Sequence, residues 1–315
     1  MKHSLATTSL LMLLLAGSAG AQEISHVRNL APDATVSSVD FSKDILRSLS
    51  PGERTPLNLM KDDGSSSFII LSSANTPGMN GAFYKTEVSL VTHWTSSRIK
   101  VNMYGIPNDT SPLSNPSVIH GGSFTLNGLT NYHWDNILDM LGLKGAGYVL
   151  VAVDSSAYSN YTSYLMSATA NTYTASPDGG FFRTPIPVFT DGSLLSSTAS
   201  YRVPNMNQDS LNRHNMVVFN VNATKSLTVN LRFHTYSTTG WSPSIAITVP
   251  PIGATQVSYD SLFHSLTGEG ELAFNPDSSS SSSGPWVGYA IRTDNTTNDG
   301  LLLLPYRADF ANWPQ

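Results

Sequence analysis

The fold is decided by the sequence YDSLFHSL at residues 259–266, which TGEG follows at 267–270. The apolar residues Leu262, Phe263 and Leu266 are spaced so that they fall on one side of a short helix. The glycines behind them favour an end to the helix and a return to extended chain. The stretch therefore predicts a helix of one to two turns set among β-strands.

Similar stretches occur twice earlier in the chain. Residues 134–141 read WDNILDML and are followed by three closely spaced glycines, whereas residues 44–49 read DILRSL and precede Gly52. Each helical stretch is followed by a strand, a loop that contains Asp and Ser, and a second strand. This order occurs three times, which indicates an array of internal repeats.

Each repeat then contains a Ser/Thr-x-Asn-Thr segment and a turn dipeptide. The segments lie at 73–76, 169–172 and 293–296, and the Asn-Gly or Asp-Gly dipeptides lie at 80–81, 178–179 and 299–300. These dipeptides adopt positive φ at low cost, and apolar residues resume directly after them. The pattern predicts three β-hairpins.

Two of the repeats also have alternating strands in front of the helix. The apolar positions 88, 90, 91, 99, 101 and 103 correspond to 216, 218, 219, 227, 229 and 231. The segments between these strands, 95–97 and 222–225, predict a hairpin turn in each copy. The earliest copy lacks this opening hairpin, so the array is two full repeats preceded by a partial one.

Short strands, regular turns and one short helix per repeat predict an all-β protein made of tandem β-sandwiches. A partial repeat at 22–84 has too few strands to bury a core of its own. We therefore expect it to pack onto the full repeat at 85–187, which gives one domain over 22–187. The second full repeat is expected to form another domain over 188–315.

The N-terminus is typical of a secretory signal peptide. Residues 10–16 are apolar and residues 19–21 are small, so cleavage is expected after residue 21. The alternative is an uncleaved anchor, but the apolar run falls well short of the roughly 20 residues that span a bilayer. We expect no transmembrane segment, and a mature chain exported to the periplasm, the cell surface or the extracellular space.

Composition excludes several classes of function. The sequence has no cysteine, which excludes a disulfide framework, a thiolate metal site and a cysteine nucleophile, and which favours a bacterial origin for an exported protein. It has 17 basic and 22 acidic residues, and only 12% of all residues are charged. No basic patch is expected for nucleic acid or anionic lipid. Ser, Thr, Asn and Tyr must therefore supply most of the polar surface.

The repeats resemble an Ig-like β-sandwich repeat of secreted bacterial proteins to which no activity is attached. In that type of repeat, a strand hairpin leads through a Gly-rich turn and a short helix to an Arg-Thr-x-Asn segment. Residues 291–295, Ile-Arg-Thr-Asp-Asn, carry the closest match, whereas the other two copies keep Thr or Ser and Asn but not Arg. The resemblance covers most of the mature chain and implies a fold and an exported location.

No motif predicts catalysis, a cofactor or a bound metal. The chain has no Gly-x-Ser-x-Gly elbow, no His-Glu-x-x-His and no phosphate-binding glycine loop. Asp135 and Asp260 recur in matching copies, but each is interpreted as a helix N-cap rather than as one of a glycosidase's two carboxyls. The segment from Asp294 to Gly300 is similar to a calcium loop, but its glycine is one place late and no bidentate glutamate follows, so a hairpin turn is favoured.

Aromatic residues are the remaining candidates for binding. Trp134 aligns with Tyr259, so both are expected to pack beside their helices. Trp241 and Trp286 have no counterparts in the other copies, and such a residue either stacks on a sugar ring or fills a local core.

Three functions are compatible with these features. The first is a non-enzymatic, exported protein with a binding, adhesion or cell-surface structural role, whose partner is a surface glycan or protein. The second is a carbohydrate-binding module or carbohydrate-active enzyme that uses Trp241 or Trp286. The third is an assembly subunit whose edge strands pair with partners.

Overall fold

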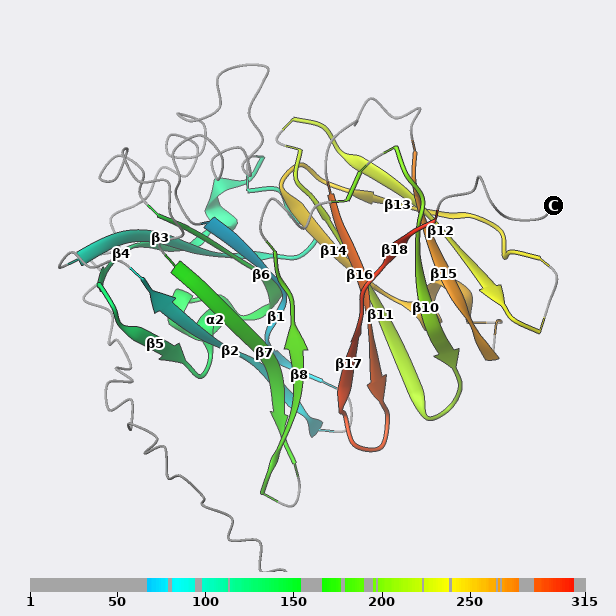
Figure 1. Ribbon diagram of the computed structural model, residues 1–315, viewed down its shortest axis with the longest axis horizontal. Helices are drawn as coiled ribbons and strands as arrows, with labels where there is room; N and C mark the ends of the chain where they lie inside the picture. The colour runs from blue at the N-terminus through cyan, green and yellow to red at the C-terminus, as the bar shows by residue number, and fades with distance from the viewer. Residues whose placement is uncertain are drawn as a thin grey trace, which may run out of the picture.

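The described part of the chain is mainly β-strand. The computed structural model describes residues 67–308, apart from gaps at 79–80, 94–97, 113, 154–165, 177–178, 190–194, 197, 223, 238–239, 265, 267 and 278–285. Its sheets are antiparallel, and the described residues include two short α-helices. The all-β class predicted from the sequence is therefore confirmed (Figure 1).

The strands fall into two groups, which we call the first unit and the second unit. The first unit contains β1 (Ser67–Pro77), β2 (Phe83–Thr92), β3 (Arg98–Pro107), the 3₁₀ turn η3 (Pro116–Val118), β4 (His120–Asn127), β5 (Asn131–Trp134), α2 (Ile137–Leu141), β6 (Gly145–Val153), β7 (Met166–Ala175), β8 (Phe181–Ile186) and β9 (Val188–Phe189). The second unit contains β10 (Tyr201–Gln208), β11 (Asn212–Asn220), β12 (Leu227–Thr235), β13 (Ile245–Val249), β14 (Gly253–Ser258), α3 (Tyr259–Phe263), β15 (Gly268–Pro276), β16 (Trp286–Asp294), β17 (Gly300–Leu303) and β18 (Tyr306–Arg307).

The earliest part of the predicted array lies outside the described residues. This part comprises the signal segment 1–21, the helix expected at 44–49 and the rest of the partial repeat up to residue 66. The strand predicted at 68–71 is present as part of β1.

Strand β1 connects two layers of the first unit. The order of paired strands is β4-β3-β6-β1-β2-β7-β8, with β5 also paired to β2 and β9 to β1. Most of β1 pairs with β6, and its last residues, from Asn75 onward, pair with β2. A bulge between Ile70 and Ser73, with Ser72 at a left-handed φ of 54°, separates the two parts of the strand.

The second unit has two separate sheets with a corresponding strand order. One sheet runs β13-β12-β15-β10-β18 and the other runs β14-β11-β16-β17. Strand β10 has a bulge between Val203 and Met206, with Asn205 at a φ of 59°. A core of buried aromatic and aliphatic side chains, which includes Phe233 and Phe274, holds the unit together.

The three hairpins predicted at Asn-Gly and Asp-Gly dipeptides are confirmed. Antiparallel pairing joins β1 to β2, β7 to β8 and β16 to β17. Backbone hydrogen bonds across the turns support them, for example from Ser176 N to the Gly180 carbonyl and from Asp294 N to the Asp299 carbonyl.

The hairpins predicted between β2 and β3 and between β11 and β12 are wrong. Strand β2 pairs with β1, β5 and β7, whereas β3 pairs with β4 and β6, and β11 and β12 likewise lie in different sheets. The chain therefore crosses between layers here, although the turn predicted at 95–97 itself lies outside the described residues. Val88 of β2 and Val101 of β3 lie in one core. Alternation identified these buried positions but could not distinguish neighbours in a sheet from strands that face each other across a core.

The predicted helix caps Asp135 and Asp260 are also wrong. Helix α2 is capped by Asn136, whose side chain accepts a hydrogen bond from Asp139 N, and helix α3 follows Ser258, whose side chain makes no cap bond. The aspartate of each copy is displaced from the cap position, on the N-terminal side in α2 and on the C-terminal side in α3. The prediction that Trp134 and Tyr259 pack beside the helices is confirmed, because both are buried in their units' cores.

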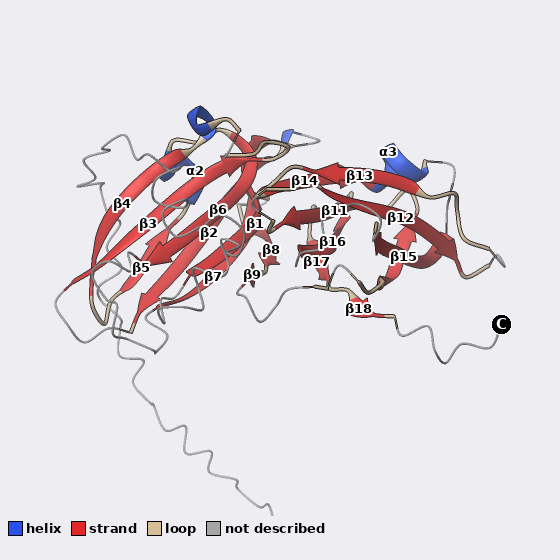
Figure 2. Cartoon of the chain, turned by 90° about the horizontal axis from the view of Figure 1, so that it is seen from above, coloured by secondary structure: helices blue, strands red, loops and turns tan. Residues whose placement is uncertain are grey.

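A third apolar core lies between the two units, which Figure 2 shows side by side. Its buried members are Ile69, Leu71, Tyr104, Ile106, Tyr148, Leu150 and Phe189 of the first unit and Val217, Phe219, Val221, Ile252, Ala254, Val287 and Tyr289 of the second. Hydrogen bonds accompany it, from Tyr148 to the Ile252 carbonyl and between the hydroxyls of Ser72 and Tyr289, 2.6 Å apart. One face of the first unit is thereby covered by one face of the second.

The domain boundary near residue 187 stays a prediction. Strand β9, just beyond it, pairs with β1 of the first unit. None of the helices in the described part of the chain is long and apolar enough to cross a membrane.

Candidate functional site

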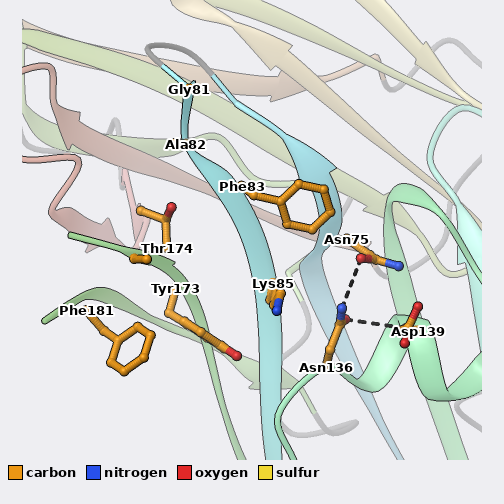
Figure 3. A pocket seen from close by; sticks show the side chains of 11 residues that line it. Asn75, Gly81, Ala82, Phe83, Lys85, Asn136, Asp139, Tyr173, Thr174 and Phe181 are labelled. Atoms are coloured by element: carbon orange, nitrogen blue, oxygen red, sulfur yellow. Dashed lines mark hydrogen bonds between the residues drawn. The ribbon is translucent and has the colours of Figure 1, made fainter. Parts of the chain in front are cut away.

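A hollow of about 720 Å³ opens on the first unit, at one end of strands β2, β7 and β8 (Figure 3). Val88 and Leu90 of β2 belong to the core of the unit, so Lys85, three residues before Val88, faces the opposite side of the sheet. We call this feature the outer-face hollow. Its described lining is Asn75, Gly81, Ala82, Phe83, Lys85, Asn136, Asp139, Tyr173, Thr174, Ala175 and Phe181.

The register of four strands brings the central side chains into one row. Lys85 is opposite Asn75 on one side and Tyr173 on the other, and Tyr173 is in turn opposite Arg183. Directly opposite residues of a sheet present their side chains on the same face. The sheet therefore places an amide, an ammonium and a phenol in one row across the hollow, with the Arg183 guanidinium next in the row beyond it.

Two exposed aromatic rings line the hollow (Figure 3). The Phe83 side chain is 44% exposed and that of Phe181 is 57% exposed. The ring of Tyr173 meets that of Phe181 edge to face, with centroids 5.4 Å apart, and the Arg183 guanidinium lies 5.5 Å from the centroid of Phe181. These contacts hold the Phe181 ring in place, and Phe83 and Phe181 both leave apolar surface open to a ligand.

Amide side chains also line the hollow. Asn136 Nδ2 donates to Asn75 Oδ1 at 2.9 Å, and Asn75 Nδ2 donates to the Leu143 carbonyl at 3.0 Å. Because Asn136 also caps α2, the helix holds both amides in a fixed orientation. Figure 3 shows this chain of amides next to the Asp139 carboxylate.

Glu87 supports the Phe181 ring through Arg183. Its carboxylate lies 3.3 Å from Arg183 Nε and accepts a hydrogen bond of 2.9 Å from Asn171 Nδ2. Burial raises the pKa of Tyr173, and the carboxylates of Asp135 and Glu87 raise it further. The Tyr173 phenol is therefore protonated at neutral pH and can donate a hydrogen bond.

Among the described lining residues the hollow has one carboxylate. That carboxylate belongs to Asp139, whereas hydrolysis of a glycosidic bond requires two carboxyls that face each other. Across the described residues, no group of three or more His, Asp or Glu side chains could hold a metal ion.

Trp241, one of the two tryptophans predicted to bind, lies in the second unit and away from the outer-face hollow. Its half-buried ring is held between cations, with the Arg202 guanidinium 5.0 Å and the Arg232 guanidinium 5.9 Å from its centroid. The His234 ring lies 5.2 Å away. Arg202 in turn is paired with Glu271 at 2.7 Å. Trp241 therefore belongs to a charged cluster whose central pair, Arg202 and Glu271, is buried.

Trp286, the other predicted ligand-binding residue, is fully buried. Its indole N–H donates to the Ser196 carbonyl at 3.2 Å, and its ring contacts Tyr201 and Phe274 in the core of the second unit. The prediction that it stacks on an external ligand is therefore not supported, because no face of the ring is open to solvent. Trp286, which has no counterpart in the other copies, instead fills the core of its unit. The structure does not bring it together with Trp241.

The calcium-like segment forms the turn of the β16–β17 hairpin, as predicted. Asp294 Oδ1 accepts hydrogen bonds from the backbone N–H groups of Thr296 and Thr297, at 2.7 and 2.8 Å. These two bonds lower the pKa of Asp294. The carboxylate thus serves the turn itself.

The residues of the outer-face hollow were not predicted from the sequence as a site. Phe83 and Phe181 each come directly after a predicted turn, which marks them as strand residues but not as exposed ones. Compared with known proteins, the chain matches no protein-family model, and no curated protein is significantly similar to it.

Proposed function

We propose that the chain is an exported, non-enzymatic β-sandwich protein that binds a carbohydrate in the outer-face hollow. One observation carries this proposal: exposed rings of Phe83 and Phe181 share a hollow with fixed amides and charged groups. A sugar has apolar C–H faces and an equatorial rim of hydroxyls. Aromatic rings pack against the C–H faces, whereas amide, ammonium and carboxylate groups form hydrogen bonds with the hydroxyls.

We also propose that the two units are copies of one Ig-like sandwich. The bulges of β1 and β10 support it, because Ser72 and Asn205 adopt nearly the same left-handed φ. The starts of β6 and β15 support it as well, because Gly145 and Gly268 have φ values of 112° and 104°. Irregular backbone at matching places is hard to obtain from two unrelated sandwiches.

Export is inferred from the signal-like segment 1–21 and the absence of cysteine from the sequence. Its test is the mass of the protein recovered outside the cytoplasm, which should correspond to a chain that begins at Gln22. Retention of Met1 on exported protein would contradict it.

Binding is tested with the full mature chain and a panel of neutral oligosaccharides, measured by isothermal titration calorimetry. Phe181→Ala should lower the affinity at least tenfold, because an exposed stacking surface is lost. Leu211→Ala is the matched control, since Leu211 is 60% exposed but does not line the hollow. Absence of binding to every neutral oligosaccharide, or equal affinity of wild type and Phe181→Ala, would overturn the proposal.

A further inference from the structure

A second hollow, of about 340 Å³, lies where the two units meet. Tyr84 and Thr184 of the first unit and Arg213, Gln256 and Asn298 of the second line it. Figure 1 shows β8 beside β17 at this junction, and the two strands are in contact. We call it the junction hollow. Binding sites are found preferentially at such boundaries between units.

Arg213 is held rigidly at the junction hollow by neutral oxygens. Its Nη1 donates to Asn295 Oδ1 at 2.8 Å, and its Nη2 donates to Asn298 Oδ1 at 2.9 Å and to the Tyr84 hydroxyl at 2.8 Å. The Tyr84 hydroxyl itself donates to Asn298 Oδ1 at 3.1 Å. The guanidinium is thus fixed by both units.

The charge of Arg213 has no ion-pair partner among the described residues. The ion pairs there involve His133, Arg183, Arg202 and His234. Asp294 is close enough for Arg213 to contribute a small part of its pKa lowering, but that carboxylate is bonded to backbone N–H groups of its own turn. A half-buried, oriented guanidinium with only neutral partners favours an external carboxylate, which it can bind through its remaining N–H donors.

The rest of the junction hollow suits hydroxyl groups. Thr184, Asn215 and Gln256 line it with hydroxyl and amide groups, and the Asp260 carboxylate, which accepts hydrogen bonds, also borders it. Its volume is at the lower end of the range for small-molecule sites. We propose that the junction hollow binds an acidic monosaccharide unit, with the carboxylate on Arg213 and the ring hydroxyls on the polar side chains opposite.

This site is independent of the outer-face hollow, which is proposed to take neutral sugar. The test uses the full mature chain, with glucuronate, glucose and acetate as separate ligands in calorimetric titrations. Glucuronate should bind, and glucose and acetate should each bind at least tenfold more weakly, because each lacks one half of the recognised chemistry.

Arg213→Gln should lower the affinity for glucuronate at least tenfold. Gln256→Glu should also lower this affinity at least tenfold, because it adds a negative charge that repels the glucuronate carboxylate while preserving the shape of the side chain. Lys225→Gln is the control, because it removes an exposed cation of the same unit that does not line the junction hollow. Thermal unfolding of each variant establishes that it is folded, and any neutral-oligosaccharide binding should be the same in Arg213→Gln as in wild type.

Three results would overturn the inference. They are equal binding of glucuronate and acetate, unchanged glucuronate affinity in folded Arg213→Gln and Gln256→Glu, and an absence of glucuronate binding by the wild-type chain. Each of them leaves the proposal for the outer-face hollow unaffected, since that proposal depends on neutral ligands and on Phe181.

Discussion

His214 shows how far a single residue can depart from its usual chemistry. It lies on β11, its side chain is 1% exposed, and neither ring nitrogen has a hydrogen-bond partner among the described residues. Burial, and secondarily the charge of Arg292, lowers its pKa to about 4. The ring is therefore neutral in the folded protein at any pH well above 4.

This burial predicts a loss of stability in mild acid. A histidine with a pKa near 6.5 when unfolded and about 4 when folded binds its proton more tightly in the unfolded chain. The contribution of neutral His214 to the free energy of unfolding is complete above pH 6.5. It should decline by up to about 3 kcal/mol as the pH falls to 4. Urea unfolding across this range measures the decline.

His214→Leu provides the comparison, because it removes the titrating group from the core. Its stability should fall less steeply than that of wild type between pH 6.5 and 4. His264→Leu, at an exposed position of the same unit, should follow the wild-type curve. Parallel curves for wild type and His214→Leu would show that the ring does not titrate as inferred.

At the cap of α2, neighbouring residues have different roles. Asn136 caps the helix and bonds Asn75, whereas Asp135 is exposed and contacts His133 at 3.1 Å. Asn136→Ala should therefore destabilise the protein by about 0.5–2 kcal/mol. Asp135→Ala should have almost no effect, and chemical denaturation of both variants measures the difference. A larger cost for Asp135→Ala would restore it as the cap.

At the scale of the elements, Gly147 of β6 is required by a close approach of two strands. A Cβ at this position would collide with the carbonyl oxygen of Ile106 on β3, and Gly270 meets the carbonyl of His234 in the same way. Gly147→Ala should cost about 1–3 kcal/mol, because the strands must separate to admit the methyl group. Gly180→Ala, where the space is open and φ is ordinary, should be tolerated. Equal urea midpoints for the two variants would contradict this explanation.

The elements also show what the sequence could and could not predict. Turn dipeptides located three hairpins, because Asn-Gly and Asp-Gly act locally. Alternation located buried residues such as Val88 and Val101, but it assigned their strands to one sheet, since it contains no information about partners. The outer-face hollow depends on the register of Asn75, Lys85 and Tyr173 across three strands, which only the folded sheet determines.

At the scale of the whole molecule, the core between the units bears on how the chain unfolds. The sequence predicts that 22–187 and 188–315 fold separately. The shared core predicts that each half, once separated, exposes an apolar face that includes Tyr148 on one side and Phe219 on the other. We expect the full chain to unfold in one transition and each half to be less stable or to aggregate. Calorimetry of the full chain and of the halves 22–187 and 188–315 measures their thermal unfolding. Two halves as stable as the full chain would establish independent domains.

The contact between the units joins two unlike faces, and such a contact can in principle continue from molecule to molecule into a fibre. On the joined face of the first unit, Ile106 lies opposite Tyr148. At the matching register of the second unit, His234 lies opposite Glu271, which is paired with Arg202. An incoming apolar face would meet this charged cluster there, and not a row of apolar side chains. The charged cluster around Trp241 thus does not repeat the apolar face through which the first unit contacts the second.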